Sequence, residues 1–452
     1  MLLLLLACVH PAPPAPPPPA PVAVEAPAPP PPAPVDPVID QLRASLRADA
    51  ATGYARLVAL CDGFGPRPTG SPALAQAIEW GLARFREDGL QNVRAEPVMV
   101  PVWRRGDESL RLLTPYEEPL AMLGLGGSVG TKKTEASVVV VRSFDELGPH
   151  VKGKIVLYNV PMIEGTPQIA QYGTAVAFRS RGAARAAEFG AVAALVRSVT
   201  TRSLYTPHTG GMGYGDATTK IPAAAITTED ADRIARLVAS GVDVRLRLQM
   251  GAQALPDAPS ANAIAEIPGT TDEIVVVGGH IDSWDVGTGA HDDGAGIVQT
   301  IEAMRHIQKL GIKPRRTIRA VLFTNEEMGL RGGIAYAKEH AAEKHVAAVE
   351  TDLGAGRPRG WNVKGNAADL AWLQTVLAPT GLGVVGEGGG ADIGPLGETG
   401  VLMIGLAPDD SRYFDVHHTE ADTVDKVDPA ALAEGSAELA ALVWRLANVE
   451  RP

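Results

Sequence analysis

Acidic and histidine side chains recur in the second half of the chain, several of them directly after segments with the pattern of buried β-strands. They are His280, Asp282, Asp292, Asp293, Glu326, Glu327, Asp352, His417 and His418. Residues 274–278 (IVVVG) are apolar throughout, as in a central parallel strand, and the chain continues into His280. The predicted strands 317–324 and 346–351 lead into the two glutamates and into Asp352. Because ligands of open α/β sheets bind beyond the carboxyl ends of the strands, we expect these side chains at one edge of a sheet.

This set of side chains suits a pair of metal ions. Several carboxylates brought together without cations repel one another and are costly to remove from water. Two divalent ions need one bridging carboxylate and two terminal ligands each, which five residues supply. A further carboxylate, not bound to metal, must take a proton from the attacking water. The residues therefore meet the needs of a two-metal hydrolase.

Each residue has a simpler interpretation when it is taken alone. A lone histidine at a strand end, such as His280, is more often structural or solvated than a ligand. Asp292 and Asp293 open a predicted helix, where acids cap free N–H groups and offset the helix dipole. Asp282 follows His280 by two residues and can accept the second imidazole N–H. Only the convergence of all these residues favours a metal site.

Composition removes several other classes of protein. The only cysteines are Cys8 and Cys61, which excludes a disulfide framework and a cysteine-based zinc site. The net charge of −11 and the absence of a Lys/Arg-rich run predict no nucleic-acid partner. No apolar run is long enough for a transmembrane span. Ser283 lacks the G-x-S-x-G context of a serine hydrolase.

The N-terminus has features of an export segment. Residues 1–8 (MLLLLLAC) end like the lipobox of bacterial lipoproteins, although the positive region of a signal peptide is missing. Residues 11–37 are dominated by Pro and Ala and predict an extended spacer. Either Cys8 carries a lipid anchor or the segment is only an apolar tip. The spacer favours export, to the extracellular space, the periplasm or the outer membrane as a lipoprotein.

Periodicity predicts the elements that position the acidic and histidine side chains. Ile39–Leu60 and Ser71–Asp88 have helical spacing, with Ser71 as the N-cap of the second helix. Val93–Trp103 alternates like a strand. From residue 271 onward, strands alternate with helices, which predicts a largely parallel sheet.

Residues 109–255 predict a smaller α/β module of their own. Its predicted elements are the strands 137–142, 153–159, 191–197 and 221–226 and the helices 179–189 and 228–239. A chain of 452 residues is long enough for two or three domains.

Several long motifs resemble those of the M28 metallopeptidase family, which contains co-catalytic zinc aminopeptidases and carboxypeptidases. They are GPRPTGSP (65–72), LGLGGSVGT (123–131), SFDEL (143–147), LYTPHTG (204–210), KIPAAAITTEDA (220–231), GGHIDSWDVGTGAHDDGAG (278–296), NEEMG (325–329) and HHTEADT (417–423). The resemblance covers nearly all of residues 40–450. It implies a mostly parallel mixed sheet flanked by helices, of the zinc aminopeptidase type, with an inserted protease-associated α/β domain. The implied division is a signal remnant (1–8), a linker (9–38), a catalytic domain in two parts (39–108 and 256–452) and the insert (109–255).

The resemblance also assigns roles within the site. It implies two zinc ions, with Asp292 bridging them, His280 and Asp352 on one, and Glu327 and His418 on the other. The same ligands admit manganese or cobalt. Glu326 would be the general base, Asp282 the partner of His280, and the Asp292–Asp293 peptide would be cis. His417 remains the alternative to His418. Candidate substrate contacts are His208 and Asp392, the latter equally readable as a turn residue of the loop 388–395.

The implied reaction is hydrolysis of small peptides, chiefly dipeptides with free termini, by a homodimeric enzyme. One alternative is an aminopeptidase of the same class that acts on longer chains. A second alternative, from another functional class, is a receptor-like binding protein that has lost the metals. Loss of ligands would mark that class, and every expected ligand is present in this sequence.

Overall fold

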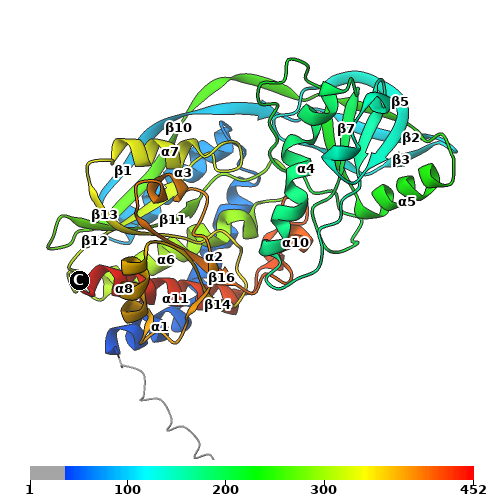
Figure 1. Cartoon of the computed structure of the whole chain (residues 1–452). Helices are drawn as coiled ribbons and strands as arrows, with labels where there is room; N and C mark the ends of the chain where they lie inside the picture. The colour runs from blue at the N-terminus through cyan, green and yellow to red at the C-terminus, as the bar shows by residue number, and fades with distance from the viewer. Residues whose placement is uncertain (1–35, 452) are drawn as a thin grey trace, which may run out of the picture.

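The computed structural model describes residues 36–451, which form two eight-stranded mixed sheets with helices packed against them (Figure 1). The apolar tip, Cys8 and all but the end of the Pro/Ala segment lie outside the described residues. Within residues 36–451, no helix has both the length and the apolarity needed to cross a bilayer. The two sheets confirm a mixed α/β fold.

The first sheet has the strand order β1-β10-β12-β11-β13-β16-β14-β15. Its strands are β1 (Gln91–Arg104), β10 (Gln253–Ile267), β11 (Glu273–His280), β12 (Thr317–Phe323), β13 (Lys344–Glu350), β14 (Pro358–Lys364), β15 (Val384–Glu387) and β16 (Leu402–Pro408). The central strands β12, β11, β13 and β16 are parallel, and antiparallel pairs flank them. The carboxyl ends of four neighbouring strands therefore meet at one edge, as the sequence predicts.

The helices around this sheet are α1 (Pro37–Ala48), α2 (Ala50–Phe64), α3 (Pro72–Glu87), α6 (Ala295–Lys309), α7 (Arg331–Glu339), α8 (Ala367–Leu377), α9 (Gly394–Gly397), α10 (Tyr413–Val416) and α11 (Pro429–Asn448). The predicted cap of α3 is confirmed, because the Ser71 hydroxyl accepts the Leu74 N–H at 3.1 Å. The largest hydrophobic cluster packs α3, α6 and α11 on the sheet, and it buries Phe85 and Val277 completely. Such close packing gives the strand ends a rigid support.

The single helix predicted over 39–60 is wrong, because the chain forms α1 and α2 with a break at Asp49. This residue leaves helical geometry at φ −108° and ψ 18°. Its carboxylate accepts the Thr52 hydroxyl and pairs with Arg305 of α6 at 2.7 Å. An aspartate whose side chain bonds locally competes with the helix backbone, and periodicity alone does not reveal that competition.

The second sheet has the order β3-β2-β9-β5-β6-β7-β8-β4. Its strands are β2 (Glu108–Thr114), β3 (Glu118–Leu120), β4 (Met122–Gly124), β5 (Thr131–Val141), β6 (Ile155–Tyr158), β7 (Ala193–Arg197), β8 (Ala223–Ile226) and β9 (Arg245–Met250), and its helices are α4 (Ile169–Glu188) and α5 (Thr228–Ala239). We call residues 108–250 the second-sheet module. Helix α4 begins at Ile169, before the predicted start at 179, and its N-cap Gln168 makes no capping bond that the sequence could signal.

The strands β1 and β10 connect the second-sheet module to the first sheet. They form a long antiparallel pair in which Gln91 lies opposite Glu266 and Arg104 lies opposite Gln253. The chain thus leaves the first sheet along β1 and returns along β10 (Figure 1).

Candidate metal centre

The candidate ligands follow the carboxyl ends of the central strands. His280 is the last residue of β11, Glu326 and Glu327 follow β12, and Asp352 follows β13. Asp292 lies in the tight turn Ala290–Gly294 that opens α6. The two histidines His417 and His418 follow α10, after β16. Parallel strands that end together bring residues far apart in sequence to one place.

Asp292 is at the middle of this group. Its Oδ1 lies 3.1 Å from His280 Nε2, and its Oδ2 lies 3.1 Å from His418 Nε2. His280 Nε2 is also 3.3 Å from Asp352 Oδ1, and His418 Nε2 is 3.3 Å from Glu327 Oε2. The five residues therefore form two halves that share one carboxylate, with a histidine and a second acid in each half.

The protein does not balance the negative charges of this group by itself. Asp292 Oδ2, Glu327 Oε1 and Asp352 Oδ1 are buried and accept no hydrogen bond from the described residues. Burial and nearby carboxylates raise the pKa of Asp352, and they raise the pKa of Glu327 to about 7. Burial alone would lower the pKa of His280, but Asp352 and Asp292 raise it well above its usual value. Buried oxygens without donors and imidazoles against carboxylates fit a site for divalent cations.

The histidine rings are oriented with Nε2 toward this group. His280 Nδ1 donates to the backbone carbonyl of Asp282 at 3.0 Å, whereas the Asp282 carboxylate is 3.9 Å away. The expected contact between His280 and the Asp282 side chain is therefore replaced by one to its carbonyl. The Asp282 carboxylate instead accepts the Glu326 N–H at 3.1 Å and the Thr69 hydroxyl at 3.2 Å. It positions the backbone that carries Glu326.

Two further acids hold the backbone around the centre. Asp293 accepts the N–H groups of His280 and Gly296, at 3.1 and 2.9 Å. Asp422 accepts the N–H groups of His291 and Asp292, at 2.8 and 3.1 Å. The Asp292–Asp293 peptide is cis, as the resemblance implied. Asp422 lies in the motif HHTEADT, but the sequence reasoning gave it no role.

The geometry favours His418 over His417 as the candidate metal ligand. His417 Nε2 is 3.6 Å from Asp292 Oδ2, while His418 Nε2 lies closer to Asp292 and also approaches Glu327. The two rings are stacked with their centroids 3.6 Å apart. Burial and the neighbouring His418 hold the pKa of His417 well below its usual value.

Glu326 lines a cavity of about 380 Å³ together with four of the candidate ligands, Asp292, Glu327, Asp352 and His418. Burial raises its pKa well above the usual value, and Asp352 and Glu327 act in the same direction against the opposing effect of His280. The cavity is lined by Ile169, Tyr172, Arg179, Gly211, Asp292, Glu326, Glu327, Leu330, Asp352, Leu353, Tyr413, His417 and His418. A glutamate there can accept a proton from water bound at the same centre.

Three of the cavity residues come from α4 of the second-sheet module, and the sequence reasoning missed them. Ile169 and Tyr172 are on its first turns, and Arg179 is 7% exposed. Among residues 36–451, no carboxylate forms an ion pair with Arg179, and its Nε has no acceptor. Its Nη1 lies 3.5 Å from the Thr209 carbonyl and 3.4 Å from His418 Nδ1. The guanidinium lies 5.3 Å from the centroid of the Tyr172 ring. The sequence indicated only an Ala-rich helix, predicted to begin at Arg179, and gave no sign that these three residues line a cavity.

The two candidate substrate contacts are buried. His208 is 2% exposed, its Nδ1 donates to the His417 carbonyl at 2.8 Å, and it does not line the cavity. Asp392 is 1% exposed, and neither carboxylate oxygen has a partner among the described residues. Burial and Glu350 raise the pKa of Asp392 well above its usual value. Asp392 does not line the cavity either.

A separate acidic group on α6 and the α1–α2 break needs no metal. Asp49, Glu302 and His306 lie close enough to share an ion. Arg305 pairs with both carboxylates, and Arg56 pairs with Glu302 at 2.9 Å. The arginines already neutralise these acids, in contrast to the centre at the strand ends.

Known proteins resemble this chain over most of its length. The sequence model of peptidase family M28 matches residues 262–443. Carboxypeptidase Q of Bos taurus is 41% identical over 410 residues, which cover 88% of this chain and 85% of that protein, and the Homo sapiens protein is 40% identical with the same coverage. The crystal structure of a peptidase M28 precursor from Shewanella amazonensis has a TM-score of 0.86 at 38% identity, covering 91% of this chain and 97% of that one. A zinc aminopeptidase from Bacillus subtilis shares the fold, with a TM-score of 0.65 at 20% identity over 89% of this chain and 95% of that one.

Proposed function

The chain belongs to peptidase family M28 and is a metallopeptidase, and we propose that it uses two zinc ions to hydrolyse unblocked dipeptides. The observation behind the two-metal proposal is the central position of Asp292, whose two oxygens face different histidines at 3.1 Å. The orphaned oxygens of Asp292, Glu327 and Asp352 support it further. The complete set of donors argues against a receptor-like protein without metals.

In this proposal Asp292 would be shared by the two ions, His280 and Asp352 would hold one of them, and Glu327 and His418 would hold the other. When bound, the metal would supply a Lewis acid for the scissile carbonyl and for the attacking water. Glu326 takes a proton from the water and returns it to the leaving amine. The Asp282 carboxylate keeps Glu326 in place by accepting the backbone N–H of Glu326.

Arg179 supports a substrate with a free carboxyl end. A buried guanidinium without an ion-pair partner among the described residues, on the wall of the cavity, suits a carboxylate ligand. The name of the relatives, Carboxypeptidase Q, agrees with such a substrate. A cavity of about 380 Å³ is at the small end of ligand sites, which suits a dipeptide.

A neighbouring cavity favours the alternative, an aminopeptidase on longer chains. It has a volume of about 510 Å³ and shares Ile169, Asp352 and Leu353 with the first cavity. It continues between Pro167 of the second-sheet module and the edge strand β15. A longer peptide would occupy this space.

We also propose that residues 109–255 form a protease-associated insert between the catalytic parts 39–108 and 256–452. The sequence pattern of residues 1–37 supports export, with Cys8 as the lipid anchor, and the resemblance to the family supports a homodimer. Light scattering, which measures the mass of the protein in solution, tests the homodimer. Labelling with a lipid precursor tests the anchor, because the wild-type protein should take up the label and the Cys8→Ser variant should not.

One panel of substrates tests the function. The purified protein, its metal content known, is given a dipeptide, the same dipeptide as an amide, its N-acetyl form and a tetrapeptide, before and after chelation. We expect about two zinc ions per chain, cleavage of the free dipeptide alone, and loss of cleavage on chelation. Efficient cleavage of the tetrapeptide would instead support the aminopeptidase, and activity after complete metal removal would contradict both. Reconstitution with zinc, manganese or cobalt identifies the metals that restore activity.

A further inference from the structure

We propose that a loop of the second-sheet module, residues 204–210, fixes the orientation of His418 and thereby the metal affinity of one half of the centre. This inference rests on the proposed role of His418 as a metal ligand. The loop lies between β7 and β8, whereas His418 follows α10. We call His208 and Thr209 the clamp.

Three hydrogen bonds join the clamp to the two histidines. The Thr209 N–H donates to the His418 carbonyl at 3.0 Å, and the Thr209 carbonyl lies 3.2 Å from His418 Nδ1. His208 Nδ1 lies 2.8 Å from the His417 carbonyl. The clamp therefore holds the ring of His418 and the peptide groups on both sides of this residue.

The contact with Thr209 selects the tautomer of His418. His418 Nδ1 lies 3.2 Å from the Thr209 carbonyl, which only accepts, and 3.4 Å from Arg179 Nη1, which only donates. The shorter contact, to the carbonyl, favours a proton on Nδ1, which leaves the lone pair of Nε2 facing Asp292 and Glu327. A partner on the far nitrogen is what orients a metal-binding imidazole in proteins. His280 gets the same support from the Asp282 carbonyl, within the first sheet.

The backbone of His418 needs such a restraint. Its φ of 62° lies in the left-handed region, which residues with a side chain adopt rarely and at a cost. The carbonyls of His417 and His418 both accept hydrogen bonds from the clamp. The contacts therefore offset the cost of the conformation that points the ring at Asp292.

The clamp is in turn fixed to the second sheet. The Thr209 hydroxyl donates to the Gly124 carbonyl at 2.7 Å, at the end of β4. The His208 N–H donates to the Ser198 hydroxyl, which donates to the Ile226 carbonyl at the end of β8. One half of the centre thus depends on the second-sheet module, whereas the hydrogen-bond partners of His280 among residues 36–451 all lie outside that module.

Zinc binding to His208 variants tests the clamp directly. His208→Phe keeps a ring and removes the donor, while His208→Asn places an amide donor near the position of Nδ1. His306→Asn removes another buried imidazole, which bonds to Ser45 far from the centre, and is the matched control. The two zinc affinities are measured by chelator competition, and the melting temperature of the zinc-free protein is recorded for each variant.

We expect His208→Phe to weaken one zinc ion by roughly 10- to 100-fold and the other by less than about threefold, with substantial recovery in His208→Asn. Thr209→Val is a milder variant, expected to fold, that keeps the backbone bonds to His418 and loses the hydroxyl contacts with Gly124 and Arg105. It should weaken the same ion by about threefold or more. Equal weakening of both ions, no weakening, or no recovery in His208→Asn would overturn the inference. A wild-type protein that binds fewer than two zinc ions would refute the proposed function instead.

Discussion

Replacing Glu326 by Gln should separate catalysis from stability. The amide cannot accept a proton, so we expect the rate of dipeptide cleavage to fall by about 100- to 10,000-fold, as for loss of a general base. The five candidate ligands and the Asp282 contact to the backbone N–H of residue 326 remain. Zinc content should therefore not change.

The zinc-free protein should become more stable in the same variant. Burial, Asp352 and Glu327 raise the pKa of Glu326 well above that of an unfolded glutamate. An acid whose folded-state pKa is raised destabilises the fold above its unfolded pKa, by about 1.4 kcal/mol for each pH unit between the two values. Glutamine removes this cost at neutral pH, and acidification toward the unfolded pKa should remove it from the wild type.

The assays are single-turnover cleavage of a dipeptide, zinc content, and thermal unfolding of the chelated proteins at pH 5 and pH 8. Glu398→Gln, an exposed glutamate outside the cavity, is the control and should match the wild type in all three. Residual activity above a tenth of the wild-type value, or a lower melting point of chelated Glu326→Gln, would refute the reasoning about this residue.

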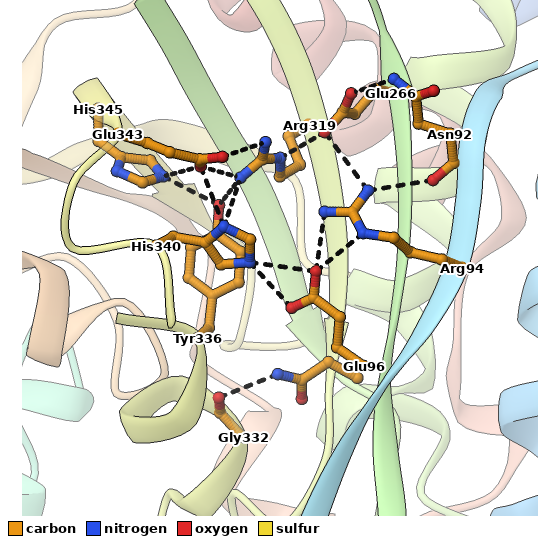
Figure 2. Close-up of polar contacts among 11 residues, drawn as sticks. Asn92, Arg94, Glu96, Glu266, Arg319, Gly332, Tyr336, His340, Glu343 and His345 are labelled. Carbon is orange, nitrogen blue, oxygen red and sulfur yellow. Dashed lines mark hydrogen bonds and ion pairs between the residues drawn. The ribbon is translucent and has the colours of Figure 1, made fainter. Parts of the chain in front are cut away.

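Three further outcomes are expected. Arg179→Met should lower kcat/KM for the free dipeptide by on the order of 100-fold and affect the dipeptide amide much less, whereas Arg181→Met on the exposed side of α4 should do neither; equal losses on acid and amide would contradict the carboxylate contact. Arg319→Met should destabilise the fold by about 2–4 kcal/mol without loss of zinc, because the buried guanidinium binds Glu266 at 2.7 Å and the Tyr336 hydroxyl at 3.0 Å (Figure 2). Calorimetry measures the loss of stability, and metal analysis checks that the zinc content is unchanged. Burial and Arg319 lower the pKa of His345 to about 4, so between pH 6.5 and pH 4 only the unfolded chain takes up this proton, and stability should fall as the pH drops through about this range. Denaturant unfolding should show that the free energy of unfolding changes less steeply with pH in His345→Gln. An unchanged pH dependence would exclude this histidine as a source of the effect.

The sequence was informative where one motif contains both the residue and its neighbours. His280, Glu327 and Asp352 lie at or just beyond the ends of apolar strands, and the parallel order of those strands brings them together as predicted. The cis peptide at Asp292 was likewise expected from the motif around it. The predicted helix at 71–88 was recognisable because its cap lies in the adjacent residue.

The contacts that the sequence did not predict are made by backbone groups or come from distant segments. The partner of His280 is the carbonyl of Asp282, and a carbonyl has no residue type that a pattern could detect. Arg179 reaches the cavity only because α4 packs toward α10, more than 200 residues later in the chain. The break at Asp49 depends on a partner in α6. Local periodicity contains no information about these tertiary partners.

The order of the ligands along the chain has a consequence during biosynthesis. The contact between Thr209 and His418 joins a module made early to a segment near the C-terminus. Domains generally fold as units from the N-terminus while synthesis continues. With the proposed ligand set, the nascent chain therefore lacks one half of the metal centre until residue 418 has emerged and docked, and we expect no peptidase activity before that point.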